Sequence, residues 1–373
     1  MGDDSTVEMK DATIPHPTQV DQQRIVLQQR VVIPSTHAET STHTDEKGSD
    51  DDDCRHLHFA LFACQHTAPY GPARHTASLF LKIISRALTA AGVATINSTS
   101  TTTTCVWNVR VVVYDAVQSD YPQTEEEWDS YDGFLLPGSL SAAYDTEEWI
   151  LKLANIITSE LHGKNRKSLG ICFGHQLYAH AFSPHGLAIK CPSGFQAGRK
   201  TASLTPEGSF LLGSHSSGNK GTTTTGKTKE ELDALLYTHG DMVEKLPPCA
   251  VCLGGTEPTV PIQTVAYFQT EQDAAQFQAF VRTSDRRMVP PKPPILPIAI
   301  TFQAHPEYAD RKHGAEATFG AVMDKVNKKD MLSLDELKAA EQDMMDNFHK
   351  IEDQSTQVVA RVGAWLGWWE SNS

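Results

Sequence analysis

The segment that decides the fold reads Ser168-Leu-Gly-Ile-Cys-Phe-Gly-His-Gln176. Its first four residues are an apolar run short enough for a buried strand, and a helix is expected from His175 to Phe182. Between the two lies Cys172, with Gly170 two positions before it and Gly174 two positions after it. A tight strand-to-helix turn that exposes a nucleophile in a strained backbone conformation requires small residues at these two positions. The segment therefore predicts a nucleophilic cysteine at the carboxyl end of a strand, with a buried structural cysteine as the alternative.

The helix expected after this turn points its N-terminus at Cys172, which adds to this prediction. Its N-terminus carries a partial positive charge and free backbone N–H groups, which favour a thiolate and can bind an oxyanion. Both are useful for acyl transfer through a covalent intermediate.

A second segment, Gln303-Ala-His-Pro-Glu307, supplies the partners that such a nucleophile needs. It follows Pro297-Ile-Ala-Ile-Thr-Phe302, which is expected to be a central strand, so His305 also lies at a strand end. Glu307 is close enough in sequence to orient the His305 ring and to stabilise an imidazolium ion. Chain order separates this arrangement from an α/β-hydrolase, in which the acid follows the nucleophile and the histidine comes much later.

Strands and helices alternate along the chain from residue 56 onward. Such alternation predicts a three-layer α/β fold, in which helices flank a mostly parallel central sheet. Two further strands, Gly198–Leu204 and Val260–Phe268, are expected to form a small antiparallel flap at the side of the sheet. Polar, low-complexity or proline-rich composition predicts surface insertions at 99–104, 213–230 and 271–294. The other expected elements are strands at 56–63, 109–114 and 131–137 and helices at 73–91, 147–161, 333–346 and 357–370.

Composition divides the chain into three parts. Residues 1–53 carry twelve acidic and four basic side chains and little apolar surface, which predicts a disordered acidic tail. Residues 54–320 form the predicted α/β domain, and residues 321–373 form a helical extension packed on it or flanking it. The tryptophans between Trp365 and Trp369 have helical spacing, which favours the buried face of a terminal helix over an exposed partner site.

Charge and composition exclude several classes of function. The formal net charge of -14 comes without a basic patch, which argues against nucleic-acid binding. No apolar run reaches the length of a membrane span and no secretory signal is recognised, so no membrane association and a cytoplasmic location are expected. The seven cysteines are scattered, which suits a reducing compartment. Cys249 and Cys252 form a C-x-x-C pair without a second pair at zinc-site spacing, so burial is favoured over metal binding or redox work, and no metal or cofactor is expected.

The order cysteine, histidine, glutamate resembles the triad of class I glutamine amidotransferase domains. The resemblance covers roughly Leu57 to Tyr308 and implies a flavodoxin-like arrangement of the three layers. Four motifs in the family's order carry it. They are Asp132-Gly-Phe-Leu-Leu-Pro-Gly-Ser139, Gly170–Gln176, Tyr237-Thr-His-Gly-Asp241 with Leu246-Pro-Pro248, and Gln303–Glu307.

The resemblance implies roles for the three residues of the triad. Cys172 is the implied nucleophile, His305 the general base and then the general acid, and Glu307 the residue that orients the histidine.

Further residues take roles from the same resemblance. The implied oxyanion hole consists of the N–H of Phe173 and that of Gly138 or Ser139. Gln176 is implied to hold the substrate, and His239 and Asp241 are implied to line its site. For His239 and Asp241, a plain turn without a functional role is equally consistent with the sequence.

Ammonia transfer needs an acceptor, and the chain contains nothing that resembles a synthetase. It has no phosphate-binding glycine loop followed by lysine and serine or threonine. It resembles instead the free-standing branch of the family, which includes plant and fungal γ-glutamyl peptidase-like proteins. This implies a small γ-glutamyl substrate, cleaved at its amide bond through a thioester on Cys172. The alternatives are a glutaminase subunit that supplies ammonia to a separate synthetase partner, and a non-catalytic regulatory protein on the same fold.

Overall fold

The computed structural model describes residues 24–34, 54–65, 72–92, 104–213, 230–284, 293–329 and 331–370. The predicted insertions at 99–104 and 213–230, except for their end residues 104, 213 and 230, and most of the predicted acidic tail lie outside these residues.

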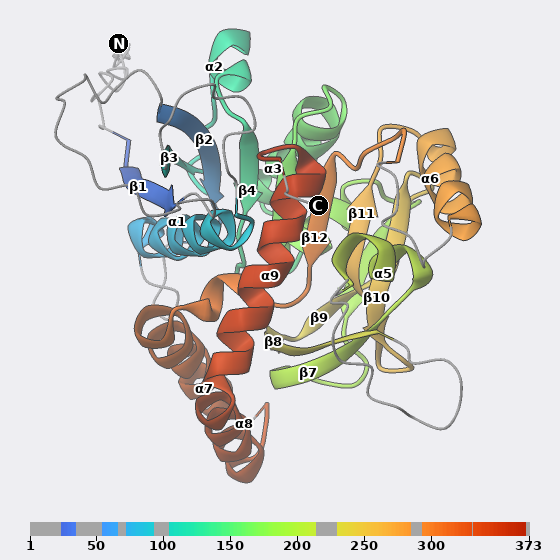
Figure 1. Cartoon of the computed structure of the whole chain (residues 1–373). Coiled ribbons are helices and arrows are strands. Elements are labelled where there is room, and N and C mark those ends of the chain that lie inside the picture. Colours follow the sequence, from blue (N-terminus) through green and yellow to red (C-terminus); the bar gives the residue numbers. More distant parts are fainter. Residues whose placement is uncertain are drawn as a thin grey trace, which may run out of the picture.

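Ten strands of the described residues form one central sheet, which lies behind α1 and α9 in Figure 1. Its middle is parallel, in the order β3 (Thr104–Asp115), β2 (Cys54–Ala63), β4 (Gly133–Leu136), β5 (Ser168–Ile171) and β12 (Ala299–Phe302). Antiparallel strands continue the sheet beyond both ends of this parallel part. On one side lies β1 (Val26–Pro34), and on the other lie β11 (Val260–Tyr267), β10 (Ala250–Thr256), β7 (Gln196–Leu204) and β8 (Glu231–His239).

The helices cover both faces of this sheet, so the predicted three-layer α/β fold is confirmed. A two-stranded antiparallel sheet, β6 (Leu187–Lys190) with β9 (Asp241–Lys245), stands beside it. The α-helices are α1 (Ala73–Ala90), α2 (Glu125–Asp129), α3 (Glu148–Ile156), α4 (Phe173–His180), α5 (Pro206–Leu212), α6 (Glu271–Thr283), α7 (Gly320–Asn327), α8 (Leu334–Asp346) and α9 (Phe348–Leu366). Three further helical segments are η1 (Ile157–His162), η2 (Pro306–Ala309) and η3 (Arg311–Phe319).

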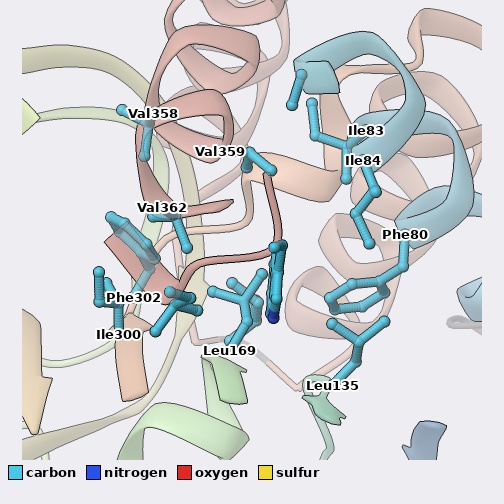
Figure 2. Close-up of a cluster of buried hydrophobic side chains, with 14 of the residues drawn as sticks. Phe80, Ile83, Ile84, Leu135, Leu169, Ile300, Phe302, Val358, Val359 and Val362 are labelled. Carbon is cyan, nitrogen blue, oxygen red and sulfur yellow. The ribbon is translucent and has the colours of Figure 1, made fainter. Parts of the chain in front are cut away.

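Alternating side chains of the parallel strands enter two separate cores, because successive residues of a strand point to opposite faces. In β2, Phe59 and Leu61 face the core under α1 and α9, whereas Ala60 and Phe62 face the core under α3 and α4. Figure 2 shows the first of these cores, in which helical side chains gather over the sheet. The labelled residues are Phe80, Ile83 and Ile84 of α1, Val358, Val359 and Val362 of α9, and Leu135, Leu169, Ile300 and Phe302 of the sheet.

Helix α9 crosses this face of the sheet beside α1 (Figure 1). The chain then turns at Gly367, whose φ of 76° is in the left-handed region, and brings two buried tryptophans back onto the core. Trp368 packs edge-to-face on Phe59 of β2, with ring centroids 4.8 Å apart. Trp369 lies against Gly363, where a Cβ atom would be only 2.0 Å from the indole ring. Trp368 and Trp369 are therefore buried, as predicted, but they lie beyond the end of α9 at Leu366 and not on a face of that helix.

Part of the segment predicted to be a disordered tail is instead the ordered strand β1. Residues 26–34 pair antiparallel with β3 over their whole length, and Arg24 bonds to the carboxylates of Asp120 and Glu127. Val31 and Ile33 are buried against the sheet, which is the apolar surface that holds this strand in place.

The first half of the predicted insertion at 271–294 is a helix and not a surface loop. Residues 271–283 form helix α6, which begins with a capping box between Thr270 and Asp273 and buries Phe277 and Val281. Within the described part of the chain, no helix is long and apolar enough to cross a membrane.

Candidate active site

The predicted strand-to-helix turn is present at Cys172. This residue directly precedes α4 and has φ 53° and ψ -103°, a backbone conformation that residues other than glycine rarely adopt. Both flanking glycines are needed for close packing. A Cβ atom on Gly170 would lie 2.9 Å from Cγ2 of Thr301, and one on Gly174 would lie 2.3 Å from the carbonyl oxygen of Leu136. The spacing of the two glycines thus follows from how tightly the turn packs on the neighbouring strands.

Cys172 and His305 come together because they follow adjacent parallel strands. Ile171 at the end of β5 is paired in register with Phe302 at the end of β12. The N–H of Cys172 donates to the carbonyl oxygen of Phe302 at 2.7 Å, which fixes the turn against the strand that leads to the histidine. Both residues therefore lie at the carboxyl edge of the sheet, where ligands of such folds bind.

His305 and Glu307 form a buried pair. The Nδ1 of His305 donates to Oε1 of Glu307 at 2.7 Å, and the two side chains are 0% and 5% exposed. The ring also stacks on Tyr308, with centroids 4.3 Å apart and planes inclined by 9°. With Nδ1 engaged in this way, Nε2 is left as the nitrogen that can exchange a proton.

Electrostatics favour the charged form of this histidine. Burial alone would lower the pKa of His305, but the Glu307 carboxylate and the nearby Cys172 side chain outweigh burial and raise the pKa to about 10. The surroundings of the ring therefore favour its protonated form, next to the side chain of Cys172.

The loop after β4 lies next to this turn. The N–H of Gly174 donates to the carbonyl oxygen of Pro137 at 3.2 Å, so the loop and the start of α4 are directly connected. Three backbone N–H groups at this junction have no acceptor among the described residues, and they belong to the residues predicted for the oxyanion hole: Gly138, Ser139 and Phe173. The N–H of Phe173 is the first of α4 and has no acceptor within the helix for geometric reasons.

The three residues predicted to hold the substrate converge on one corner, between β8 and β9. Gln176 donates from Nε2 to the backbone oxygen of Asp241 at 2.9 Å and to Oε1 of Gln303 at 3.1 Å, so both amide hydrogens are used within the protein. Nδ1 of His239 donates to the same backbone oxygen at 2.8 Å. The thiol of Cys172 lies 3.9 Å from the carbonyl oxygen of Thr238, one residue before His239. The corner therefore borders the sulfur, while substrate binding itself stays a prediction.

The pKa values of two of these side chains differ from their ordinary values. Burial, with a smaller contribution from nearby His305, lowers the pKa of His239 to about 4, so the ring is neutral at pH 7. Burial also raises the pKa of Asp241 above its usual range, and a hydrogen bond from Tyr144 opposes this effect. The Tyr144 hydroxyl donates to Oδ1 of Asp241 at 2.9 Å.

The His-Pro-Glu turn is supported from behind by α1 and α9. Arg86 donates from Nη1 to the carbonyl oxygen of Ala309, the last residue of η2, at 2.6 Å. The same nitrogen lies 2.8 Å from Oε1 of Glu352 in α9. The C-terminal helix thus contributes to the position of the turn that carries Glu307.

Sequence reasoning missed four residues that contact the site. Gln65, Tyr144 and Gln303 hydrogen-bond to its loops, and Tyr308 stacks on the histidine. Gln303 and Tyr308 lie inside or next to the quoted His-Pro-Glu motif, so proximity in sequence was an available signal. Nothing in the sequence distinguished Gln65 or Tyr144.

No group of three or more His, Cys, Asp or Glu side chains with the geometry of a metal site occurs among the described residues. Cys249 and Cys252 are both free thiols, and burial raises the pKa of each.

The strained turn at Cys172 and the buried His305–Glu307 pair thus lie together at the carboxyl edge of the parallel strands of an α/β fold. The family model "Glutamine amidotransferase class-I" matches residues 97–325, which is more than half of the chain. The chain belongs to the class I glutamine amidotransferase family.

Curated relatives match over shorter stretches. Gamma-glutamyl peptidase 4 of Arabidopsis thaliana is 44% identical over 68 residues, which is 18% of this chain and 26% of that protein. Gamma-glutamyl peptidase 3 of the same plant is 29% identical over 147 residues, or 39% of this chain and 53% of that protein. A putative glutamine amidotransferase-like protein of Schizosaccharomyces pombe is 24% identical over 206 residues, or 54% and 64%. The matched stretches thus span from about a quarter to less than two thirds of these relatives.

The solved structure of a glutamine amidotransferase from Thermotoga maritima has the same fold, with a TM-score of 0.51. The match covers 83% of this chain and 98% of that one at 15% sequence identity.

Proposed function

We propose that the chain is a cysteine hydrolase that cleaves γ-glutamyl amide bonds through a thioester on Cys172. The observation that carries this proposal is the buried His305–Glu307 pair at the end of the strand next to Cys172. A histidine whose pKa is raised to about 10 beside a cysteine supports an imidazolium–thiolate pair, which is an activated nucleophile without the help of a metal.

In the first half of the reaction the thiolate of Cys172 attacks the γ-carbonyl carbon, and the carbonyl electron pair moves onto oxygen. The N–H groups of Phe173 and of Gly138 or Ser139 stabilise the resulting oxyanion. When the carbonyl re-forms, the C–N bond breaks and the leaving amine takes a proton from Nε2 of His305. The products are a free amine and a γ-glutamyl thioester.

In the second half the neutral His305 takes a proton from water, and the hydroxyl oxygen attacks the thioester carbonyl. Collapse of this intermediate breaks the C–S bond, releases glutamate and restores the thiolate beside the imidazolium. Glu307 keeps its hydrogen bond to Nδ1 throughout and stabilises the imidazolium each time it forms.

The names of the Arabidopsis relatives support a γ-glutamyl peptide as the substrate, whereas the family as a whole also supports glutamine. We further propose that Gln176, His239 and Asp241 surround the glutamyl end, because they meet at the corner that borders the sulfur. A cytoplasmic location stays a prediction from the sequence.

The test is an activity screen of the purified chain on glutamine, glutathione and other γ-glutamyl conjugates, with released glutamate as the readout. Cys172→Ala should abolish release, while Cys252→Ala, which removes a partly buried thiol elsewhere in the fold, should leave it unchanged. Full turnover by a folded Cys172→Ala protein would refute the proposal.

The same screen distinguishes the alternatives. Negligible activity alone but strong stimulation by a co-purifying synthetase would support the glutaminase subunit. A non-catalytic protein would show no mass increase at Cys172 after treatment with an electrophilic glutamine analogue.

A further inference from the structure

The loop that carries the predicted oxyanion donors is anchored to the end of β2. Two consecutive residues that follow this strand supply the acceptors. The carbonyl oxygen of Cys64 accepts from the Ser139 hydroxyl at 2.9 Å, and Oε1 of Gln65 accepts from the N–H of Leu140 at 2.9 Å.

Side chains take up the backbone N–H groups just beyond the donor residues. The N–H of Leu140 is held by Gln65, that of Ser141 by the Ser139 hydroxyl at 3.2 Å, and that of Ala142 by Asp145 at 2.7 Å. The Ser139 and Asp145 acceptors belong to the same loop, whereas Gln65 lies just beyond the end of β2. Together with the bond from the Ser139 hydroxyl to Cys64, Gln65 therefore ties this peptide run to the end of β2, and it is the acceptor from outside the loop that holds one of the run's N–H groups.

We propose that Gln65 is a positioning residue of the oxyanion hole, which holds the Gly138–Leu140 backbone so that its free N–H groups face the carbonyl of the substrate. This inference rests on the proposed hydrolysis at Cys172. Gln65 acts through the loop and does not contact the reacting atoms.

The orientation of the Gln65 amide agrees with this role. Its Nε2 is buried and has no acceptor among the described residues, which is an unfavourable arrangement for an amide donor. The opposite orientation would turn Nε2 toward the Leu140 N–H, so that two donors would face each other and the only bond of this side chain to the loop would be lost. The bond to Leu140 thus decides how the side chain lies.

Gln65→Leu and Gln65→Met both remove the acceptor, and the unbranched methionine keeps the length of the side chain. Gln354→Leu is the matched control, because Oε1 of Gln354 accepts a backbone N–H in the same way, from Ala234 at 2.7 Å, away from the loop. Thermal unfolding shows whether each variant is folded.

We expect kcat of both Gln65 variants to fall by about 10- to 100-fold with little change in KM, because small misplacements of catalytic donors have effects of this order. Affinity for a glutamate γ-aldehyde, which forms an oxyanion with the cysteine, should fall by a similar factor. Alkylation of Cys172 by iodoacetamide forms no oxyanion and should keep its wild-type rate.

The outcomes separate this inference from the proposed function. Wild-type kcat and aldehyde affinity in a folded Gln65→Met protein would overturn the positioning role, even if Cys172→Ala is inactive. Equal losses of turnover, aldehyde affinity and alkylation rate would also overturn it, since they indicate general damage to the site. Activity that persists in Cys172→Ala would instead refute the hydrolysis itself.

Discussion

The pair formed by His305 and Glu307 gives the sharpest prediction, through the substitution Glu307→Gln. The glutamine side chain has nearly the same shape, and its Oε1 can still accept the 2.7 Å bond from Nδ1. The substitution therefore removes the negative charge and changes little else. Because that charge is the largest influence that raises the pKa of His305 toward about 10, the pKa of the histidine should fall.

Two consequences follow from the lower pKa. The imidazolium that protonates the leaving amine becomes less stable, and the thiolate loses its counter-charge. Replacing the carboxylate of a Ser-His-Asp triad by an amide lowers kcat by about 10⁴-fold, because the histidine then holds the wrong tautomer. We expect a loss of about 10²–10⁴-fold in kcat for Glu307→Gln.

The pH dependence provides an independent measure. A histidine whose pKa is raised in the folded protein stabilises the fold fully below its ordinary pKa of about 6.5, and this contribution is lost as the pH rises toward 10. The free energy of unfolding of the wild type should therefore decline across this window. The decline should be smaller in Glu307→Gln, and the alkaline limb of kcat/KM should move to lower pH.

The assay combines kcat/KM between pH 5 and 10.5 with denaturant unfolding at the same pH values. Glu316→Gln serves as the control, since it also neutralises a glutamate but at an exposed ion pair with Arg311. A Glu307→Gln enzyme with wild-type turnover and an unshifted alkaline limb would refute the assignment of Glu307 as the partner of His305.

Three further substitutions test other parts of the site, and Gly320→Ala is a control for the first of them. Gly174→Ala should destabilise the fold by about 3 kcal/mol or more, measured by denaturant unfolding, because its Cβ would meet the backbone of β4 at 2.3 Å. Gly320→Ala has open space at its Cβ and should be neutral or stabilising by up to about 1 kcal/mol; equal effects would show that the turn is not tightly packed. Tyr144→Phe should lower kcat/KM by about 10-fold through the lost bond to the Asp241 carboxylate, and an unchanged KM would remove Asp241 from substrate binding. Arg86→Ala should lower kcat by a few-fold without affecting KM, since it frees the end of η2, and unchanged steady-state rates would show that the turn holds without this bond.

The parallel half of the fold could be predicted because its signals are local. Short apolar runs ending in glycine, cysteine or histidine define β5 and β12, and the glycine spacing around Cys172 follows from packing that the structure shows directly. Cys172 and His305 come together because β5 and β12 are neighbours in the sheet. In the sequence, only the order of the motifs along the chain indicated that these two strands pair.

Other features depended on tertiary contacts. Strand β1 was missed because three apolar residues, Val31 to Ile33, stand within a strongly polar segment, and their burial needs β3 as a partner. Helix α6 was missed although Thr270 and Asp273 form a capping box that the sequence displays, because the proline-rich end of the segment at 290–294 suggested a surface loop. The contact of Gln65 with Leu140 joins residues 75 positions apart, and no sequence spacing predicts such a bond.

Strand β1 also has a consequence for how the protein can be shortened. A fragment that begins at Cys54 would keep every residue of the candidate active site, yet it would leave β3 as the outermost strand. That strand is long, Thr104–Asp115, and includes the valine run 111–113, so its free backbone groups would invite pairing with the same edge of a second molecule. Nine residues that composition assigned to a tail thus cover β3, and a proteolytic cut that releases them would exchange the nine-residue β1 for a twelve-residue, more apolar strand at the edge of the sheet and so promote aggregation.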